Sequence, residues 1–311
     1  MRPQFSIIFF TTLAGMAQGL LFFIALANLH SQAIPSIFLT ILALPVAFVL
    51  LTLGLIASFF HLGHPERAWR AAMMWRTSWL SREVIALPAV MAVTAVIYFY
   101  AGVSEVPRLL WFALLFTTLA LWICTAKIYQ CIRFIQEWSH PTTLANFILL
   151  GMTSGWILLE LLIALWGDTS VKVIDAPLSI IAPSLLFLSF NLKLWIWSRN
   201  RKLKPKSNLA TATGIKGSNI RQSSMGLMGG SFNTREFFHH QTDKVIANLR
   251  KTILLCAYII PMALMAYAIT SSNSLVIALA LLINYLGLLA ERWMFFAEAN
   301  HPQNLYYQRV S

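Results

Sequence analysis

The sequence consists of eight long apolar stretches separated by mostly short polar connections. A helix rises about 1.5 Å per residue, so roughly 20 apolar residues cross the hydrocarbon core of a bilayer. The pattern therefore predicts an all-α, polytopic membrane protein with eight transmembrane helices, which we expect to form two four-helix bundles. The expected spans are residues 5–29, 36–60, 84–103, 109–133, 143–166, 176–198, 245–270 and 274–296.

The long polar connection, residues 199–244, divides the chain into three parts. Residues 1–198 contain six expected spans, and residues 245–311 contain two more and a C-terminal tail. The apolar stretch near the N-terminus carries no small-residue cleavage pattern, so we interpret it as the first span and not as a removed signal.

The distribution of charge predicts the orientation. With 58% hydrophobic and 11% charged residues, the composition lies outside the range of a soluble domain. All 23 lysines and arginines lie nearer the face with both termini, except Arg108 and Lys172. Positive residues are retained on the cytoplasmic side, so we expect cytoplasmic termini. The net charge of +12 then reflects topology and anionic lipid and not nucleic acid.

The stretch from residue 61 to 83 combines histidines, acids, arginines and tryptophans directly after the second expected span. His61 therefore lies at a membrane boundary, where it can exchange protons with water while it touches a lipid-soluble ligand. The alternative interpretation is an interfacial loop that arginine and tryptophan side chains anchor, with residues 67–81 as a short interfacial helix.

The long connection contains several phenylalanines. Exposure of these side chains to water is unfavourable in a solvated linker, so we expect residues 221–240 to be an ordered element that docks a soluble partner. Its candidate docking residues are Ser231, Phe232, Arg235, Phe237 and Phe238. The alternative is a flexible basic linker that binds lipid headgroups.

Within the spans, the carboxyl group of Glu160 must be protonated, paired or on a water-accessible path. Pro261 is tolerated where a neighbour satisfies the carbonyl that it frees.

No motif for bond-making chemistry occurs, whether a Walker loop, G-x-G-x-x-G, H-E-x-x-H or G-x-S-x-G. The three cysteines form no C-x-x-C pair and cannot hold an iron–sulfur cluster alone. Protonatable residues at a membrane boundary suit quinone chemistry, which moves two electrons and two protons. His61 would hydrogen-bond a quinone oxygen and relay its proton, with Glu83 as second proton carrier. Further candidates for quinone binding are His64, Arg67 and Arg70.

The same stretch resembles a known family. FFHLGHPERAWRA followed by SWLSREVIA is similar to the loop after the second helix of the DmsC family, NrfD-like membrane anchors of dimethyl sulfoxide reductase and related molybdenum oxidoreductases. In that family the histidine of HLG and the glutamate of L-S-x-E are associated with quinol binding, which implies His61 and Glu83 here. This chain adds a second histidine, His64, so which imidazole meets the ligand stays open.

The resemblance also implies partners and cofactors. It implies a ferredoxin-like iron–sulfur subunit and a molybdopterin catalytic subunit, and no haem in the anchor. The absence of haem is also expected because all seven histidines fall at span ends or in loops. AERWMFFAEANHPQNLYYQ and MGGSFNTREFFHH resemble the branch that anchors the cytoplasm-facing sulfite-oxidising enzyme (SoeC type).

These inferences predict a quinone-binding anchor of a sulfite-oxidising complex in the bacterial inner membrane, which uses menaquinone or ubiquinone. One alternative is the quinol-oxidising anchor of a dimethyl sulfoxide reductase-type complex, and another is a passive anchor without a quinone site. An alternative of another class is a secondary transporter. Its supporting residues would be Glu160, Asn146, Asn191 and Asn284.

Overall fold

The computed structural model describes residues 2–30, 34–60, 62–167, 180–206, 208–217, 220, 239–271 and 273–302. In this part of the chain all regular structure is helical, and eight segments are long and apolar enough to cross a membrane. The predicted all-α architecture with eight spans is therefore confirmed. The segments are α1 (Phe5–Leu29), α2–η1–α3 (Ser36–Phe59), α4 (Trp79–Val103), α5 (Arg108–Gln130), α6 (Pro141–Trp166), α7 (Ile181–Arg201), α10–η4–α11 (Asp243–Ser271) and α12 (Ser274–Ala297).

Two of the spans are composite. The second is α2 (Ser36–Phe38), the π-helical turn η1 (Leu39–Ala43) and α3 (Leu44–Phe59), and the seventh is α10 (Asp243–Ile253), the π-helical turn η4 (Leu254–Ile259) and α11 (Ile260–Ser271). Outside the spans lie the 3₁₀ helix η2 (Pro65–Met74) and the short helix α8 (Leu209–Thr213).

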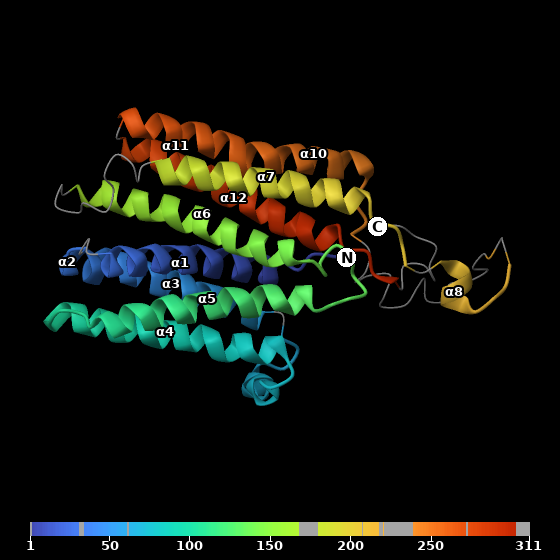
Figure 1. The fold of residues 1–311 in the computed structure, drawn as a ribbon, viewed down its shortest axis with the longest axis horizontal. Helices are drawn as coiled ribbons and strands as arrows, with labels where there is room; N and C mark the ends of the chain where they lie inside the picture. The colour runs from blue at the N-terminus through green and yellow to red at the C-terminus, as the bar shows by residue number, and fades with distance from the viewer. Residues whose placement is uncertain are drawn as a thin grey trace.

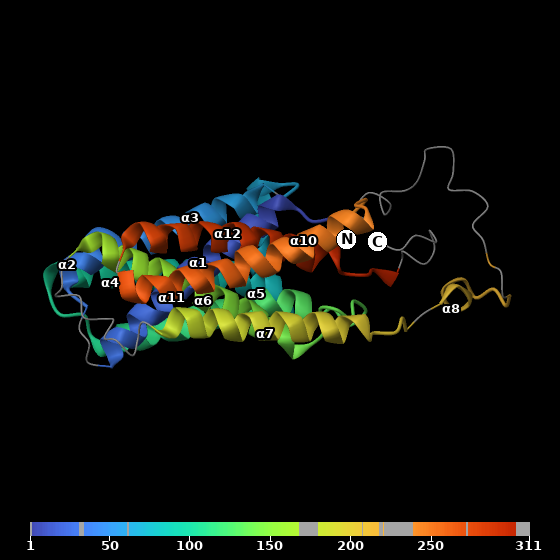
Figure 2. The ribbon, with the colours of Figure 1, turned by 90° about the horizontal axis from the view of Figure 1, so that it is seen from above.

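The spans run side by side along the long axis of the molecule (Figures 1 and 2). In one group α1, α3, α4 and α5 form a ring in which each helix packs against two neighbours, and α6, α7, α11 and α12 form a second ring. The start of α1 and the end of α12 lie at the same end of the bundle (Figure 1), which we call the terminal face. This arrangement matches the expected pair of four-helix bundles.

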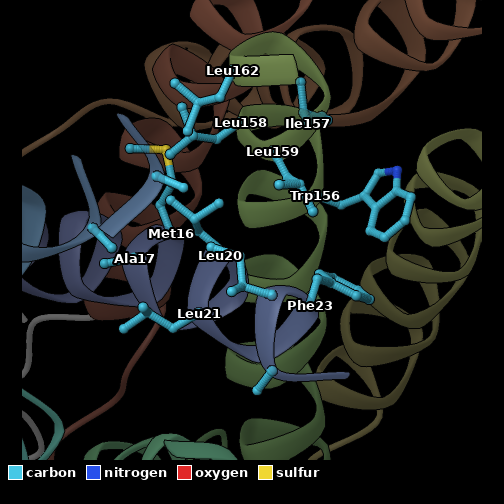
Figure 3. Packing of buried hydrophobic residues seen from close by; sticks show 14 of the residues in the cluster. Met16, Ala17, Leu20, Leu21, Phe23, Trp156, Ile157, Leu158, Leu159 and Leu162 are labelled. Atoms are coloured by element: carbon cyan, nitrogen blue, oxygen red, sulfur yellow. The ribbon is translucent and has the colours of Figure 1, made fainter. Parts of the chain in front are cut away.

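Glycines on α1 and α6 join the two rings. Gly15 and Gly19 on α1 meet Gly151 and Gly155 on α6, and a Cβ atom built on Gly19 would lie 2.0 Å from the carbonyl oxygen of Gly151. Small residues four apart allow two membrane helices to bring their backbones together. Apolar side chains of the same two helices fill the surrounding interface (Figure 3).

The π-helical turn η4 is explained by proline. Pro261 has no N–H, so the carbonyl of Ala257 loses its usual donor. Asn284 of α12 supplies a replacement, because its Nδ2 donates to the Ala257 oxygen at 2.8 Å. The sequence-based expectation for Pro261 is thus confirmed. The other π-helical turn, η1, also lies just before a proline, Pro45.

One helix boundary affects the site. Helix α4 begins at Trp79 and not at residue 84, because Ser78 caps it by accepting a hydrogen bond from the Ser81 amide. Glu83 therefore lies inside the helix, buried against α5, and not at its exposed start. At the other boundaries the helices agree with the predicted spans within a few residues, and residues 176–179 of the sixth predicted span lie outside the described residues.

Candidate functional site

The connection between α3 and α4 lies at the terminal face and carries several predicted site residues on its surface. Helix η2 packs beside the start of α4 (Figure 1) and has no buried residue. His64 Nδ1 lies 3.0 Å from Glu66 Oε1, and Arg67 Nε lies 3.7 Å from the same oxygen. The Arg70 guanidinium lies 5.5 Å from the ring centre of the exposed Trp69. His64, Arg67 and Arg70 are thus solvent-exposed or lipid-exposed, as expected for an interfacial segment.

Glu83 occupies a different environment. Its residue is 6% exposed, and the Thr125 hydroxyl on α5 donates a hydrogen bond to its Oε1. No lysine, arginine or histidine in the described part of the chain lies within 4.0 Å of this carboxyl group. The structure therefore does not bring Glu83 into contact with His64, Arg67 or Arg70.

An apolar groove lies on the outer surface between α1 and α3. It is shallow, with a volume of about 410 Å³. The groove ends at Phe60, and Ser6 is the polar residue in its wall. Its lining residues are Ser6, Phe9, Leu13, Leu53, Ile56, Ala57 and Phe60. A groove of this kind, between two spanning helices, is open to lipid.

His61 directly follows this groove in the sequence but lies outside the described residues. The candidate docking residues also lie outside them; these are Ser231, Phe232, Arg235, Phe237 and Phe238. The pairing of His61 with Glu83 and the docking role of the long connection therefore stay predictions.

A buried cluster of charges lies inside the second ring, towards the terminal face. Glu291 is fully buried; its Oε1 accepts hydrogen bonds from Lys193 Nζ at 2.8 Å and Asn146 Nδ2 at 3.0 Å. Its Oε2 accepts from Arg292 Nε at 2.7 Å, and the Arg292 guanidinium also lies 4.1 Å from the ring centre of Phe147. Two cations and one carboxylate give the cluster a formal charge of +1.

A second link between α7 and α12 lies closer to the terminal face. Trp197 Nε1 donates to Glu298 Oε2 at 3.2 Å, and Arg250 Nη2 lies 3.1 Å from Glu298 Oε1. Glu291 and Glu298 thus both face α7, as expected if they share one face of the last helix. Glu298 also helps to line an open pocket of about 810 Å³.

The polar residues that would support a transporter have separate partners. Glu160 accepts a hydrogen bond from the neutral Trp156 Nε1 and, like Glu83, has no cation within 4.0 Å among the described residues. Asn191 Nδ2 donates to the Phe187 carbonyl, Asn284 to a backbone carbonyl and Asn146 to a buried glutamate. The structure does not gather these four side chains into one substrate site.

Comparison with known proteins decides the family. The profile described as DMSO reductase anchor subunit (DmsC) matches residues 1–297. The chain belongs to the DmsC family. It is also 43% identical, over an alignment of 332 residues that covers the whole of both chains, to a sulfite dehydrogenase subunit of Allochromatium vinosum. The resemblance found in the loop after the second span is confirmed, and the eight apolar helices belong to a DmsC-family membrane protein.

The interior cluster of this DmsC-family chain was not predicted from the sequence. The charge pattern places Lys193 at the nearer membrane face, yet this residue is 1% exposed and bonded inside the bundle. The available signal was the presence of Lys193, Glu291 and Arg292 at apolar positions, because charges within spans are usually paired. For Thr125 the sequence offers no comparable signal, since threonines are frequent in these helices.

Proposed function

We propose that this chain is the membrane-anchor and quinone-binding subunit of a sulfite-oxidising molybdoenzyme complex. It passes electrons between an iron–sulfur subunit and the quinone pool. Its full-length similarity to a sulfite dehydrogenase subunit supports this substrate. Molybdopterin and the iron–sulfur clusters belong to partner subunits, and this chain itself binds menaquinone or ubiquinone and no haem.

The observation that carries the proposal is the state of Glu83. Glu291 is held between two cations, whereas Glu83 is also buried but has only a hydroxyl donor among the described residues. An acid without a neighbouring cation can gain or lose a proton without breaking an ion pair. Quinone reduction consumes two protons, and a carboxyl group of this kind is suited to supply them.

The apolar groove between α1 and α3 supports entry of the quinone from lipid. Phe60 lines the groove, and we assign the next residue in the sequence, His61, the role of hydrogen-bonding a quinone oxygen. His64, Arg67 and Arg70 are secondary candidates at the same membrane boundary. Their side chains can contact the polar head of a ligand or lipid phosphate.

The proposed setting is the bacterial inner membrane with the terminal face in the cytoplasm. The basic connections around η2 and after α7 support this orientation. The iron–sulfur and molybdopterin subunits would dock on this face, with the 231–238 segment as one contact.

Substitutions in the assembled complex test the quinone site. We expect Glu83→Gln and His61→Ala to lower quinone-coupled sulfite oxidation by about 10²-fold or more, because each removes a proton carrier. Sulfite-dependent reduction of a soluble dye, which bypasses the anchor, should not change. Glu66→Gln, an exposed acid in the same connection, is the matched control. Unchanged quinone-coupled turnover in both variants of an intact complex would show that the site assignment is wrong.

The family description supports a second candidate, the anchor of a dimethyl sulfoxide reductase-type complex that oxidises quinol. Both candidates use the same residues and differ in the direction of electron flow. Purification of the complex and assay of its catalytic subunit with sulfite and with a sulfoxide distinguishes them. Purification of the chain without any molybdenum or iron–sulfur subunit would instead favour the transporter alternative.

A further inference from the structure

A small cavity lies in the seam between the two rings, where α1 and α5 of the first ring meet α6 and α12 of the second. Its volume is about 20 Å³, and its wall combines apolar side chains with Gln18, Trp122, Arg292 and several hydroxyl groups. One water molecule needs roughly 10–15 Å³ of such space. The cavity therefore has room for one water molecule or one monatomic ion.

Arg292 contributes unused hydrogen-bond donors to this cavity. Its Nε donates to Glu291, and the ring of Phe147 covers the face of the guanidinium, whose carbon lies 4.1 Å from the ring centre. The donors that remain are the N–H groups of the two terminal nitrogens, which point outward in the guanidinium plane. Both nitrogens are buried, and no described residue accepts a hydrogen bond from them. Because Arg292 lines the cavity, a ligand bound there would be the partner that these donors lack.

The other free polar groups of the wall also favour a ligand that accepts hydrogen bonds. Trp122 is 1% exposed, and its Nε1 has no acceptor among the described residues. Gln18 Oε1 is buried without a donor, and a half-turn of this amide would present its NH₂ group instead. The hydroxyl groups already donate elsewhere, three to backbone carbonyls and one to Glu83; they belong to Thr11, Thr12, Ser154 and Thr125.

Charge distinguishes an anion from a water molecule. Lys193 and Arg292 supply two positive charges, and Glu291 supplies one negative charge and uses an oxygen for each cation. Glu83 forms no ion pair within 4.0 Å among the described residues and reaches the cavity only through Thr125. A buried charge is costly unless it is paired. A water molecule would satisfy the N–H groups but leave one positive charge uncompensated, whereas an anion does both.

We propose that this cavity binds one monatomic anion of the size of chloride. The anion accepts hydrogen bonds from the terminal N–H groups of Arg292 and from Trp122 Nε1, with the Gln18 amide turned to donate. Because Trp122 belongs to α5 and Arg292 to α12, the anion joins the two rings. It also neutralises the excess charge of the Glu291 cluster. The site is independent of the quinone function proposed above.

Thermal unfolding of the purified full-length protein in detergent tests the proposal. Chloride replaces gluconate stepwise at constant ionic strength, because gluconate is too large for a cavity of about 20 Å³. A ligand that binds only the folded state raises its stability as the ligand concentration exceeds Kd. We expect the melting temperature to rise with chloride and likewise with bromide. A melting temperature that does not respond to either halide would show that the cavity holds water alone.

Two variants assign the effect to this cavity. Lys193→Met removes the excess charge without altering the cavity wall, and Trp122→Phe removes one N–H donor from it. We expect each to shift the onset of the rise to about tenfold higher chloride or more, since hydrogen bonds and ion pairs to a buried charge are strong. Trp156→Phe is the matched control, because this buried indole donates to Glu160 and does not line the cavity. Equal onsets in Trp122→Phe and Trp156→Phe would contradict the site.

Anomalous diffraction from crystals grown in bromide locates the ion directly. We expect a bromide peak between Arg292 and Trp122 in the unmodified protein and a weaker peak or none in Lys193→Met. If Lys193→Met does not fold, the peak in the unmodified protein decides alone. Absence of that peak would overturn the proposal even if chloride raises the melting temperature, because the stabilising ion would then bind elsewhere.

Discussion

Three hydrogen-bond donors from three helices bond to the carboxylate of Glu291. A substitution of any one of these residues therefore changes the free energy of unfolding through the partners that it leaves behind. Taking charges out of water is expensive, and mutual attraction offsets that cost only when the partners remain together. Lys193 and Arg292 each contribute a cation, so the cluster has one more positive charge than negative charge. Its stability therefore depends more on the single acid than on either base.

At this residue scale we predict that Glu291→Gln destabilises the protein by about 3–5 kcal/mol, because it leaves two buried cations without the carboxylate that joins them. Lys193→Met should destabilise it less, since Glu291 and Arg292 remain a neutral pair. Thermal unfolding of the detergent-solubilised protein measures both effects. Glu298→Gln, in which the altered acid is partly exposed, provides the comparison. Equal melting temperatures for Glu291→Gln and the unmodified protein would disprove this account.

Prediction from sequence was uneven among single residues. The L-S-x-E motif identified Glu83 as a candidate site residue. Its burial was not predicted, because it results from the start of α4 at Trp79, earlier than expected. Lys193 was assigned to the correct half of its helix, but its burial and pairing were not predicted, because hydropathy treats each span separately and cannot show that a residue on a distant helix provides the counter-charge. A long-range pair such as Lys193 and Glu291 is a property of packing, which one sequence does not specify.

At the scale of elements, the contact between α1 and α6 has a sequence signature that hydropathy alone does not reveal. Both spans contain two glycines four residues apart, Gly15 with Gly19 and Gly151 with Gly155. This pattern marks a helix surface for close approach. It does not identify the partner, because any helix with a complementary surface could pack there.

We predict that Gly155→Ala disrupts this contact, because the added methyl group would overlap the backbone of Gly19. Overpacking of this kind costs about 1–3 kcal/mol or more. Gly54→Ala is the matched control, since a Cβ atom there would meet its neighbours at 3.5 Å, an ordinary contact distance. Yield of folded protein and melting temperature report the difference. Similar values for the two variants would contradict the proposed close packing.

At the scale of the whole molecule, eight spans were predictable because lipid leaves backbone groups no partners outside the helix itself. The apolar stretches of the sequence therefore form long uninterrupted helices. The grouping into two rings was expected by analogy with helical bundles, and the ring neighbours were found only in the structure.

The orientation of the molecule is testable by labelling. We predict that Lys204→Cys is protected from a membrane-impermeant thiol reagent in intact cells, while Glu105→Cys, on the opposite face, reacts. The background should be Cys131→Ser, because Cys131 is exposed. Disruption of the cells should make Lys204→Cys reactive, which controls for accessibility. Labelling of Lys204→Cys before disruption would reverse the proposed topology.

The glycine contact between α1 and α6 also limits how the molecule can move. A Cβ atom on Gly155 would lie 2.3 Å from the carbonyl carbon of Gly19, so the two rings meet backbone to backbone. Alternating-access transporters rock one half of the molecule against the other around a central site. A seam packed this closely instead favours two rings that move as one rigid body in the bilayer.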